Sequence, residues 1–210
     1  MTSIETDVLG RIEGADRFVV QQVFKPIANE YRISVAEGGS DEGAPLLFVK
    51  QKKLKIREDI RFRLSPDDDE QYLFMIKAKT VFEFRGRHDV LDSEGAQIGQ
   101  LEKAFGKSLL RSHWHVRDRT GAELFEAHES SWIIALVRRF IELGPDIFAP
   151  LQWLPFNFTL RRNGEEVASY RRVLGKFRDR YVLEVGEELA DVDRRLVLAF
   201  AVALDALQDR

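Results

Sequence analysis

The most constraining feature of this sequence is a run of nine consecutive apolar residues near its C-terminal end, Leu196 to Leu204. Asp191 and Asp193 precede the run, where carboxylates favour the start of a helix, so a helix over about 191–207 is predicted. A helix that is apolar on every side must be buried on every side. At about 1.5 Å per residue the run spans only about 14 Å, roughly half of a bilayer core. We therefore expect a core helix and no transmembrane span.

Most of the remaining chain alternates apolar and polar residues with a period of two, which is typical of β-strands. The clearest alternation covers residues 54–64 and 72–84, on either side of the acidic segment 65–70. It predicts two long strands of one hairpin.

Three shorter hairpins follow, each with a turn that ends in glycine, at residues 90–98, 116–124 and 160–167. An Asp-x-x-Gly turn favours a type I turn with the glycine in a left-handed bulge, and Asn163-Gly164 favours a two-residue primed turn. This spacing predicts roughly ten to twelve strands, a number that curls or closes instead of lying flat. Closure also removes exposed sheet edges.

The order of these elements resembles the tubby C-terminal-like superfamily, and most closely the LURP-one-related proteins and phospholipid scramblases. The resemblance rests on four segments: Phe18-Val-Val-Gln-Gln22, Tyr31-Arg-Ile33, the hairpin Val90 to Gly99, and the helix segment Asp193 to Asp205. It implies a mainly β fold, a closed antiparallel barrel of about twelve strands wrapped around a buried C-terminal helix. A filled barrel implies no interior substrate pocket.

The resemblance covers about residues 18–207 and also implies a domain division. We expect a flexible N-terminus over 1–16 and one tubby-like barrel domain over 18–210. The family is better known for binding than for catalysis. The chain lacks the proline-rich tail and the cysteine cluster for acylation of animal scramblases.

Composition narrows the function classes. The chain has 32 Lys and Arg against 35 Asp and Glu, a net charge of −3, which disfavours a nucleic-acid partner. It contains no cysteine, hence no disulfide and no thiolate nucleophile, and Met1 to Ile12 lacks the apolar core of a secretory signal. The sequence contains no motif of a catalytic nucleophile, a phosphate-binding loop or a dinucleotide-binding site, so we predict a protein that is not an enzyme and binds no cofactor. The missing cysteine and secretory signal predict a cytoplasmic location.

The polar positions of the long predicted hairpin form a basic surface. Eight lysines and arginines occupy these polar positions, together with two acids, Asp59 and Glu83. The cations are Lys53, Lys55, Arg57, Arg61, Arg63, Lys77, Lys79 and Arg85. On an antiparallel pair these side chains share one outward face, which attracts anionic headgroups at up to about 1 kcal/mol per cation. The alternative is that they only solubilise the sheet.

A second candidate surface is rich in aromatic residues. Ser130-Ser131 are expected to cap a helix over 132–143, which Gly144-Pro145 ends. The patch on this helix and the segment after it contains Trp132, Leu136, Phe140, Phe148 and Trp153. Such a segment either closes one end of the barrel or presents a patch to a protein partner, a second subunit or a membrane interface.

Histidines mark a weaker metal candidate. His113 and His115 share one face of a predicted strand, and Glu126 and His128 lie on its hairpin partner. A type I turn with a glycine bulge would pair Val116 with Leu124 and send the two pairs to opposite faces, whereas a two-residue loop would unite them. We therefore predict no metal site, with His113 and His115 as the residual candidates.

Acidic residues give no stronger metal signal. Residues 67–70 and the group Glu184, Glu187, Glu188, Asp191 and Asp193 lack a regular alternating-oxygen loop. The second group occupies the place of the acidic calcium segment of scramblases, but turn and helix-start charges account for it.

The leading hypothesis is a non-enzymatic module that binds an anionic phospholipid or phosphoinositide surface at the inner membrane face, or a protein partner, through the barrel exterior. Two alternatives stay open: a scramblase-type lipid-moving protein, and a metal-dependent barrel enzyme built on the histidine-bearing strands. The oligomeric state is not predicted.

Overall fold

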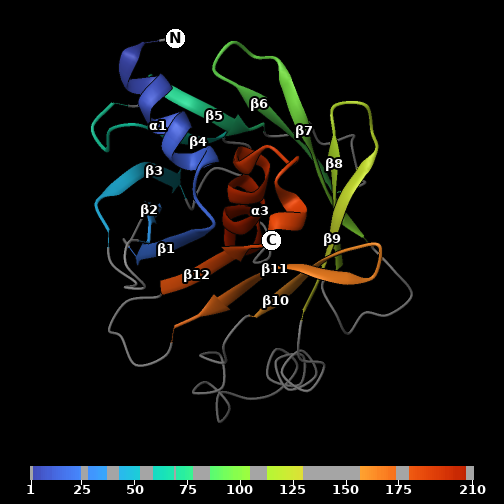
Figure 1. Ribbon diagram of the computed structural model, residues 1–210. Helices are drawn as coiled ribbons and strands as arrows, with labels where there is room; N and C mark the ends of the chain where they lie inside the picture. Colours follow the sequence, from blue (N-terminus) through green and yellow to red (C-terminus); the bar gives the residue numbers. More distant parts are fainter. Residues whose placement is uncertain are drawn as a thin grey trace, which may run out of the picture.

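A computed structural model describes residues 2–24, 28–36, 43–52, 59–68, 70–77, 86–104, 113–129, 157–173 and 180–206. In these residues twelve strands form one closed antiparallel barrel around a C-terminal helix (Figure 1). The strands are β1 (Arg17–Phe24), β2 (Ala28–Val35), β3 (Pro45–Lys52), β4 (Ile60–Arg63), β5 (Tyr72–Ile76), β6 (Arg87–Asp92), β7 (Gln97–Ala104), β8 (His113–Asp118), β9 (Glu123–Glu129), β10 (Phe158–Arg162), β11 (Glu165–Arg172) and β12 (Arg180–Val185). The predicted fold class is confirmed.

The strands follow one another around the barrel in chain order. Each pairs antiparallel with its sequence neighbours, and β1 pairs with β12 to close the ring, with Phe18 opposite Leu183. Closure pairs every strand on both sides, so no strand in the ring is left as an open edge.

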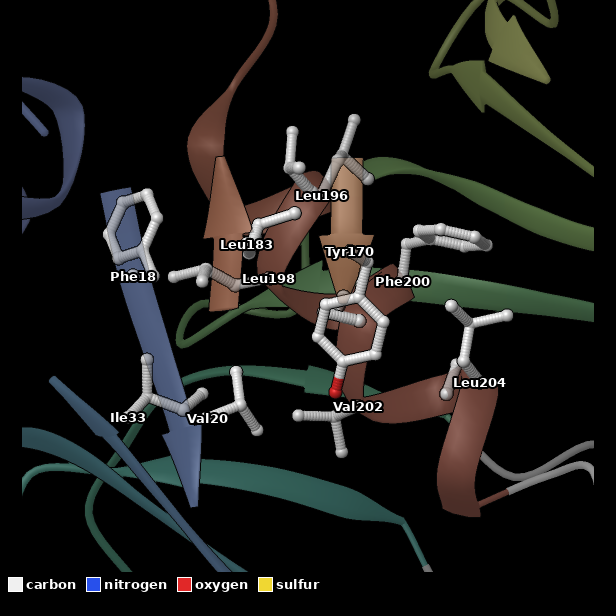
Figure 2. Packing of buried hydrophobic residues seen from close by; sticks show 14 of the residues in the cluster. Phe18, Val20, Ile33, Tyr170, Leu183, Leu196, Leu198, Phe200, Val202 and Leu204 are labelled. Atoms are coloured by element: carbon white, nitrogen blue, oxygen red, sulfur yellow. The ribbon is translucent and has the colours of Figure 1, made fainter. Parts of the chain in front are cut away.

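The C-terminal helix α3 (Arg194–Ala206) occupies the centre of the barrel. Every residue from Leu196 to Leu204 is at most 2% exposed, as the all-round apolar pattern predicted. Figure 2 shows α3 side chains among residues of β1, β11 and β12, including Phe18 and Tyr170. On another side of the helix, the Phe200 ring meets the rings of Trp114 and Phe125 edge-on, with centroids 6.2 and 5.8 Å apart.

The helix begins at Arg194, three residues later than its predicted start. A short 3₁₀ turn, η2 (Glu187–Leu189), precedes it. Asp193 caps the helix: its Oδ1 accepts the Arg195 N–H at 2.9 Å, and its carbonyl accepts the Leu196 N–H at 3.0 Å. Asp191 lies outside the helix and pairs with Arg162.

A glycine on β7 allows α3 to lie close to the barrel wall. A Cβ atom on Gly99 would lie 2.4 Å from the carbonyl oxygen of Arg117 on β8 and 2.9 Å from both methyl groups of Leu196. Real Cβ contacts are not this short. The space that a side chain would need is therefore already filled by α3 and β8.

The N-terminal segment contains a helix where the sequence analysis expected a flexible stretch. Helix α1 (Ser3–Glu13) begins with a capping box, in which the Thr2 hydroxyl accepts the Glu5 N–H and the Glu5 carboxylate accepts the Thr2 N–H. Val8 and Ile12 are buried in the core cluster, and α1 contacts α3. The polar composition of the segment concealed this pattern.

Candidate functional site

Among the described residues, the hairpin of β8 and β9 carries two groups of His and Glu side chains whose ligand atoms lie within 4.8 Å of one another. Its turn is built as predicted: Gly121 has a left-handed φ of 88°, its N–H donates to the Asp118 carbonyl, and the Asp118 N–H donates to the Ala122 carbonyl. The Asp118 carboxylate also accepts the N–H groups of Thr120 and Ala122. With this turn and no further irregularity, His113 and His115 would lie on one face of the hairpin and Glu126 and His128 on the other.

A second irregularity changes the register of this hairpin. Arg117 lies opposite Glu123, but Val116 lies opposite Phe125, so Leu124 is an extra residue on β9. Both Leu124 and Phe125 pack against the core. The pairing of Val116 with Leu124, one of the two registers that the sequence left open, is therefore not formed, because the core accepts both adjacent apolar residues and a bulge accommodates them.

One extra residue also interrupts the ladder in each of the two related hairpins. Ile98 is the extra residue between β6 and β7, and Val167 is the extra residue between β10 and β11. Ile98 packs against the core, and Val167 is 3% exposed within it. The shifted register is thus a repeated feature of this barrel.

The shift unites five side chains on the outer face of β8 and β9. We call this set the β8–β9 cluster; it consists of His113, His115, Glu123, Glu126 and His128. His113 lies directly opposite His128, and His115 opposite Glu126. Of the two arrangements that the sequence left open, the one that unites these groups is present.

The Glu126 carboxylate lies between two imidazoles. The Nε2 atom of His113 is 3.0 Å from Oε2, and the Nε2 atom of His128 is 3.2 Å from Oε1. The His113 and His128 rings stack with centroids 4.1 Å apart. Burial raises the pKa of Glu126, but hydrogen bonds from His128 and His113 and their charges outweigh it and lower the pKa.

The other half of the cluster joins a chain of ion pairs. The Nδ1 atom of His115 is 2.9 Å from Oε2 of Glu123, and Nη2 of Arg117 is 3.4 Å from the same oxygen. On β7, Glu102 pairs with both Arg87 and Arg117. Burial raises the pKa of Glu102, but the hydrogen bond and charge of Arg87, with those of Arg117, lower it overall.

The sequence analysis missed Glu102 and Glu123 as members of this surface. The signal that could have found Glu102 is the alternation on β7, where it follows the buried Leu101, whereas the extra residue Leu124 breaks the alternation on β9 and concealed Glu123. Glu102 lies opposite His115, and Glu123 lies opposite Arg117.

The predicted basic surface is only partly within the described residues. Lys53, Lys55, Arg57, Lys79 and Arg85 lie outside them. Lys77 is exposed, and the guanidinium of Arg61 lies 5.2 Å from the centroid of the Tyr72 ring.

Arg63 is not exposed as predicted. It is 4% exposed, and its Nη1 donates to the carbonyl oxygens of Pro66 and Asp68 at 3.3 and 3.4 Å. The register shift beside it leaves an extra residue, Leu73, on β5 and does not interrupt β4, where Arg63 lies opposite Phe48 and Tyr72. Contacts with the loop after β4 therefore bury Arg63, and it holds this loop instead of facing a membrane.

Arginines pair with three of the five acids before α3. Glu184 pairs with Arg17 and Arg171, and Asp193 pairs with Arg195. Asp191 receives two hydrogen bonds from Arg162, at 2.7 and 2.8 Å. Hydrogen bonding by Arg162 is the largest cause of the lowered pKa of the Asp191 carboxyl. These pairs use the carboxylates that a calcium ion would need.

The aromatic patch of Trp132, Leu136, Phe140, Phe148 and Trp153 lies outside the described residues, as does the helix predicted over 132–143. Within the ranges that the structure describes, neither helix has the length and apolar character that crossing a bilayer requires.

A family model for LURP-one-related proteins matches residues 46–205. The chain belongs to the LURP-one-related family. In this LURP-one-related chain the matched range includes the β8–β9 cluster and the residues of the predicted basic surface. No curated protein matches the chain. Among solved structures, a protein from Arabidopsis thaliana is similar with 14% identity and a TM-score of 0.35, over 97% of this chain and 98% of that one.

Proposed function

We propose that this LURP-one-related chain is a non-catalytic binding module that contacts an anionic membrane surface through the exterior of its barrel. The observation that carries the proposal is the position of α3. Its residues Leu196 to Leu204 are at most 2% exposed and occupy the centre of the barrel. The outer surface is therefore the part of the molecule that is available to a partner.

The choice of an anionic partner rests on the charge of one hairpin. Without Arg63, which is buried, the segments 53–61 and 77–85 hold seven cations against three acids, Glu58, Asp59 and Glu83. Within a Debye length of an anionic leaflet, each such cation contributes about 1 kcal/mol. The remainder of the chain is net acidic, so this concentration of positive charge is local.

Vesicle flotation tests the proposal. The full chain is mixed with vesicles of phosphatidylcholine, with or without phosphatidylserine or a phosphoinositide. We expect it to float with the anionic vesicles only and to lose binding as salt rises, because screening weakens surface attraction. Flotation with neutral vesicles to the same extent, or with none, would contradict the proposal.

A charge-reversed variant localises the contact. Lys53, Lys55 and Arg57 are changed to glutamate, and the matched control changes Arg11, Arg119 and Arg161, which are exposed elsewhere. At about 1 kcal/mol per cation, the first variant should bind anionic vesicles about a hundredfold more weakly. An equal loss in both variants would assign the effect to net charge and remove this hairpin from the proposal.

The same vesicles separate the other hypotheses. Faster movement of a fluorescent lipid between leaflets would replace this proposal with the lipid-moving alternative. Absence of vesicle binding together with a stable complex with a second protein would replace it with the protein-partner alternative.

A further inference from the structure

Two imidazoles and one carboxylate converge on the outer face of β8 and β9. The Nε2 atoms of His113 and His128 are 3.0 and 3.2 Å from the two oxygens of Glu126, and one ligand atom from each residue lies within 4.8 Å of the others. In a tetrahedral zinc site with bonds of about 2.0–2.1 Å, neighbouring ligand atoms are about 3.3 Å apart. The two imidazole–carboxylate distances are already close to this spacing, and the ligand atoms of the two histidines lie within 4.8 Å of each other.

We propose that His113, Glu126 and His128 bind one divalent transition-metal ion of the zinc class. This inference is independent of the proposed membrane contact, which uses a different hairpin. Imidazole nitrogen with a single carboxylate suits Zn²⁺, Ni²⁺ and Cu²⁺, whereas Ca²⁺ and Mg²⁺ take mostly oxygen ligands.

The barrel holds these three side chains in place. His113 and His128 are direct partners across the β8–β9 ladder, and both strands are also paired on their other side, with β7 and β10. The residues beside the histidines, Trp114 and Ala127, face inward and are fully buried. Ligands on strands that are anchored in this way need little ordering when an ion binds.

The site is open to an ion from solution. The side chains of His113, Glu126 and His128 are 31%, 29% and 34% exposed. An ion held by three protein ligands would therefore keep a fourth position for water, as in open zinc sites.

The charged residues around the site favour the binding of a cation by His113, Glu126 and His128. Ala104 on β7 lies opposite His113, and Thr159 on β10 lies opposite His128, so no cation faces either imidazole from these ladder positions. Arg161 lies opposite Glu126 but is exposed, where solvent screens its charge.

The second possible group, His115, Glu123 and Glu126, is less suitable. The Arg117 guanidinium lies 3.4 Å from Glu123 and competes with a cation for this carboxylate. Glu126 belongs to both groups, and the first group combines it with two imidazoles and does not need Glu123.

The test uses the full chain, purified without a histidine tag and titrated with zinc chloride in a calorimeter. We expect one ion per chain, weaker binding as the solution is acidified, and no comparable binding of calcium chloride. The variants H113Q, H128Q and E126Q should each bind at least tenfold more weakly. The matched control is H88Q, because His88 is the fourth histidine of the chain and lies on β6.

A measurement on the unaltered chain tests the proposal even if one of the variants fails to fold. Zinc should shift the ring NMR signals of His113 and His128 and leave the His88 signal in place. Absence of saturable zinc binding to the folded chain would overturn the proposal. So would an H88Q variant that loses as much affinity as H113Q, or ring shifts that occur at His88 and not at the trio.

Discussion

Replacing Gly99 with alanine should destabilise the barrel strongly. The added Cβ atom would lie 2.4 Å from the Arg117 carbonyl oxygen and 2.9 Å from two methyl groups of Leu196. The Leu196 side chain is 1% exposed, and the carbonyl belongs to the backbone of β8. Either β8 or α3 must therefore move.

The magnitude follows from overpacking. Inserting one methyl group into a well-packed core costs typically about 1–3 kcal/mol, and contact on two sides places Gly99→Ala near the upper end, at about 3 kcal/mol. For a chain of this size that corresponds to a fall of about 6–12 °C in melting temperature.

The control is the same substitution at Gly10, in α1. A Cβ atom there would have nothing within 4 Å, and alanine is favoured over glycine in a helix by about 0.5–1 kcal/mol. Gly10→Ala should therefore stabilise the chain slightly. Urea unfolding followed by circular dichroism measures both changes. A Gly99→Ala midpoint within error of the unaltered chain would refute the argument that α3 and β8 leave no space at this glycine.

Two further predictions concern the core helix and the acidic turn before it. Phe200→Ala should lower the free energy of unfolding by about 3–5 kcal/mol, because it leaves a cavity beside Trp114 and Phe125; a loss below about 1 kcal/mol in urea unfolding would contradict this packing. The Arg162 hydrogen bond lowers the pKa of Asp191 in the folded chain, so this carboxylate contributes stability above its unfolded pKa, which is lost as the pH falls through the folded value. Asp191→Asn should therefore flatten the acid side of the stability profile, measured as urea midpoints from neutral to acidic pH, and an unchanged profile would count against the pair.

The barrel and its central helix could be predicted because their signals are local and redundant. Leu196 to Leu204 leaves no polar side for solvent, and long alternating segments indicate strands wherever they pair. Turn chemistry was equally local: Asn163 and Gly164 both have positive φ, at 55° and 88°, as a primed two-residue turn requires.

The sequence could not decide between the two registers of the β8–β9 hairpin, of which one assembles the β8–β9 cluster, because register depends on the opposite strand and on the core. Leu124 and Phe125 look like the end of one alternation, yet both pack inward, and that single extra residue decides which face Glu126 and His128 occupy. Arg63 shows a related limit, since contacts with the carbonyl oxygens of the following loop, which the strand pattern does not reveal, bury it. Helix α1 was missed for a different reason: its capping box, Thr2 and Glu5, is a local signal, but its buried residues are Val8 and Ile12 in an otherwise polar segment, so the apolar periodicity is weak.

The pairing of β1 with β12 has a consequence for biosynthesis. The first strand to leave the ribosome must wait for the last one before it acquires its second neighbour. Until then both ends of the growing sheet present unpaired backbone, which is prone to association with other chains. The segment that completes the hydrophobic interior, α3, is translated after every strand, so the nascent sheet has to stay open long enough to admit it.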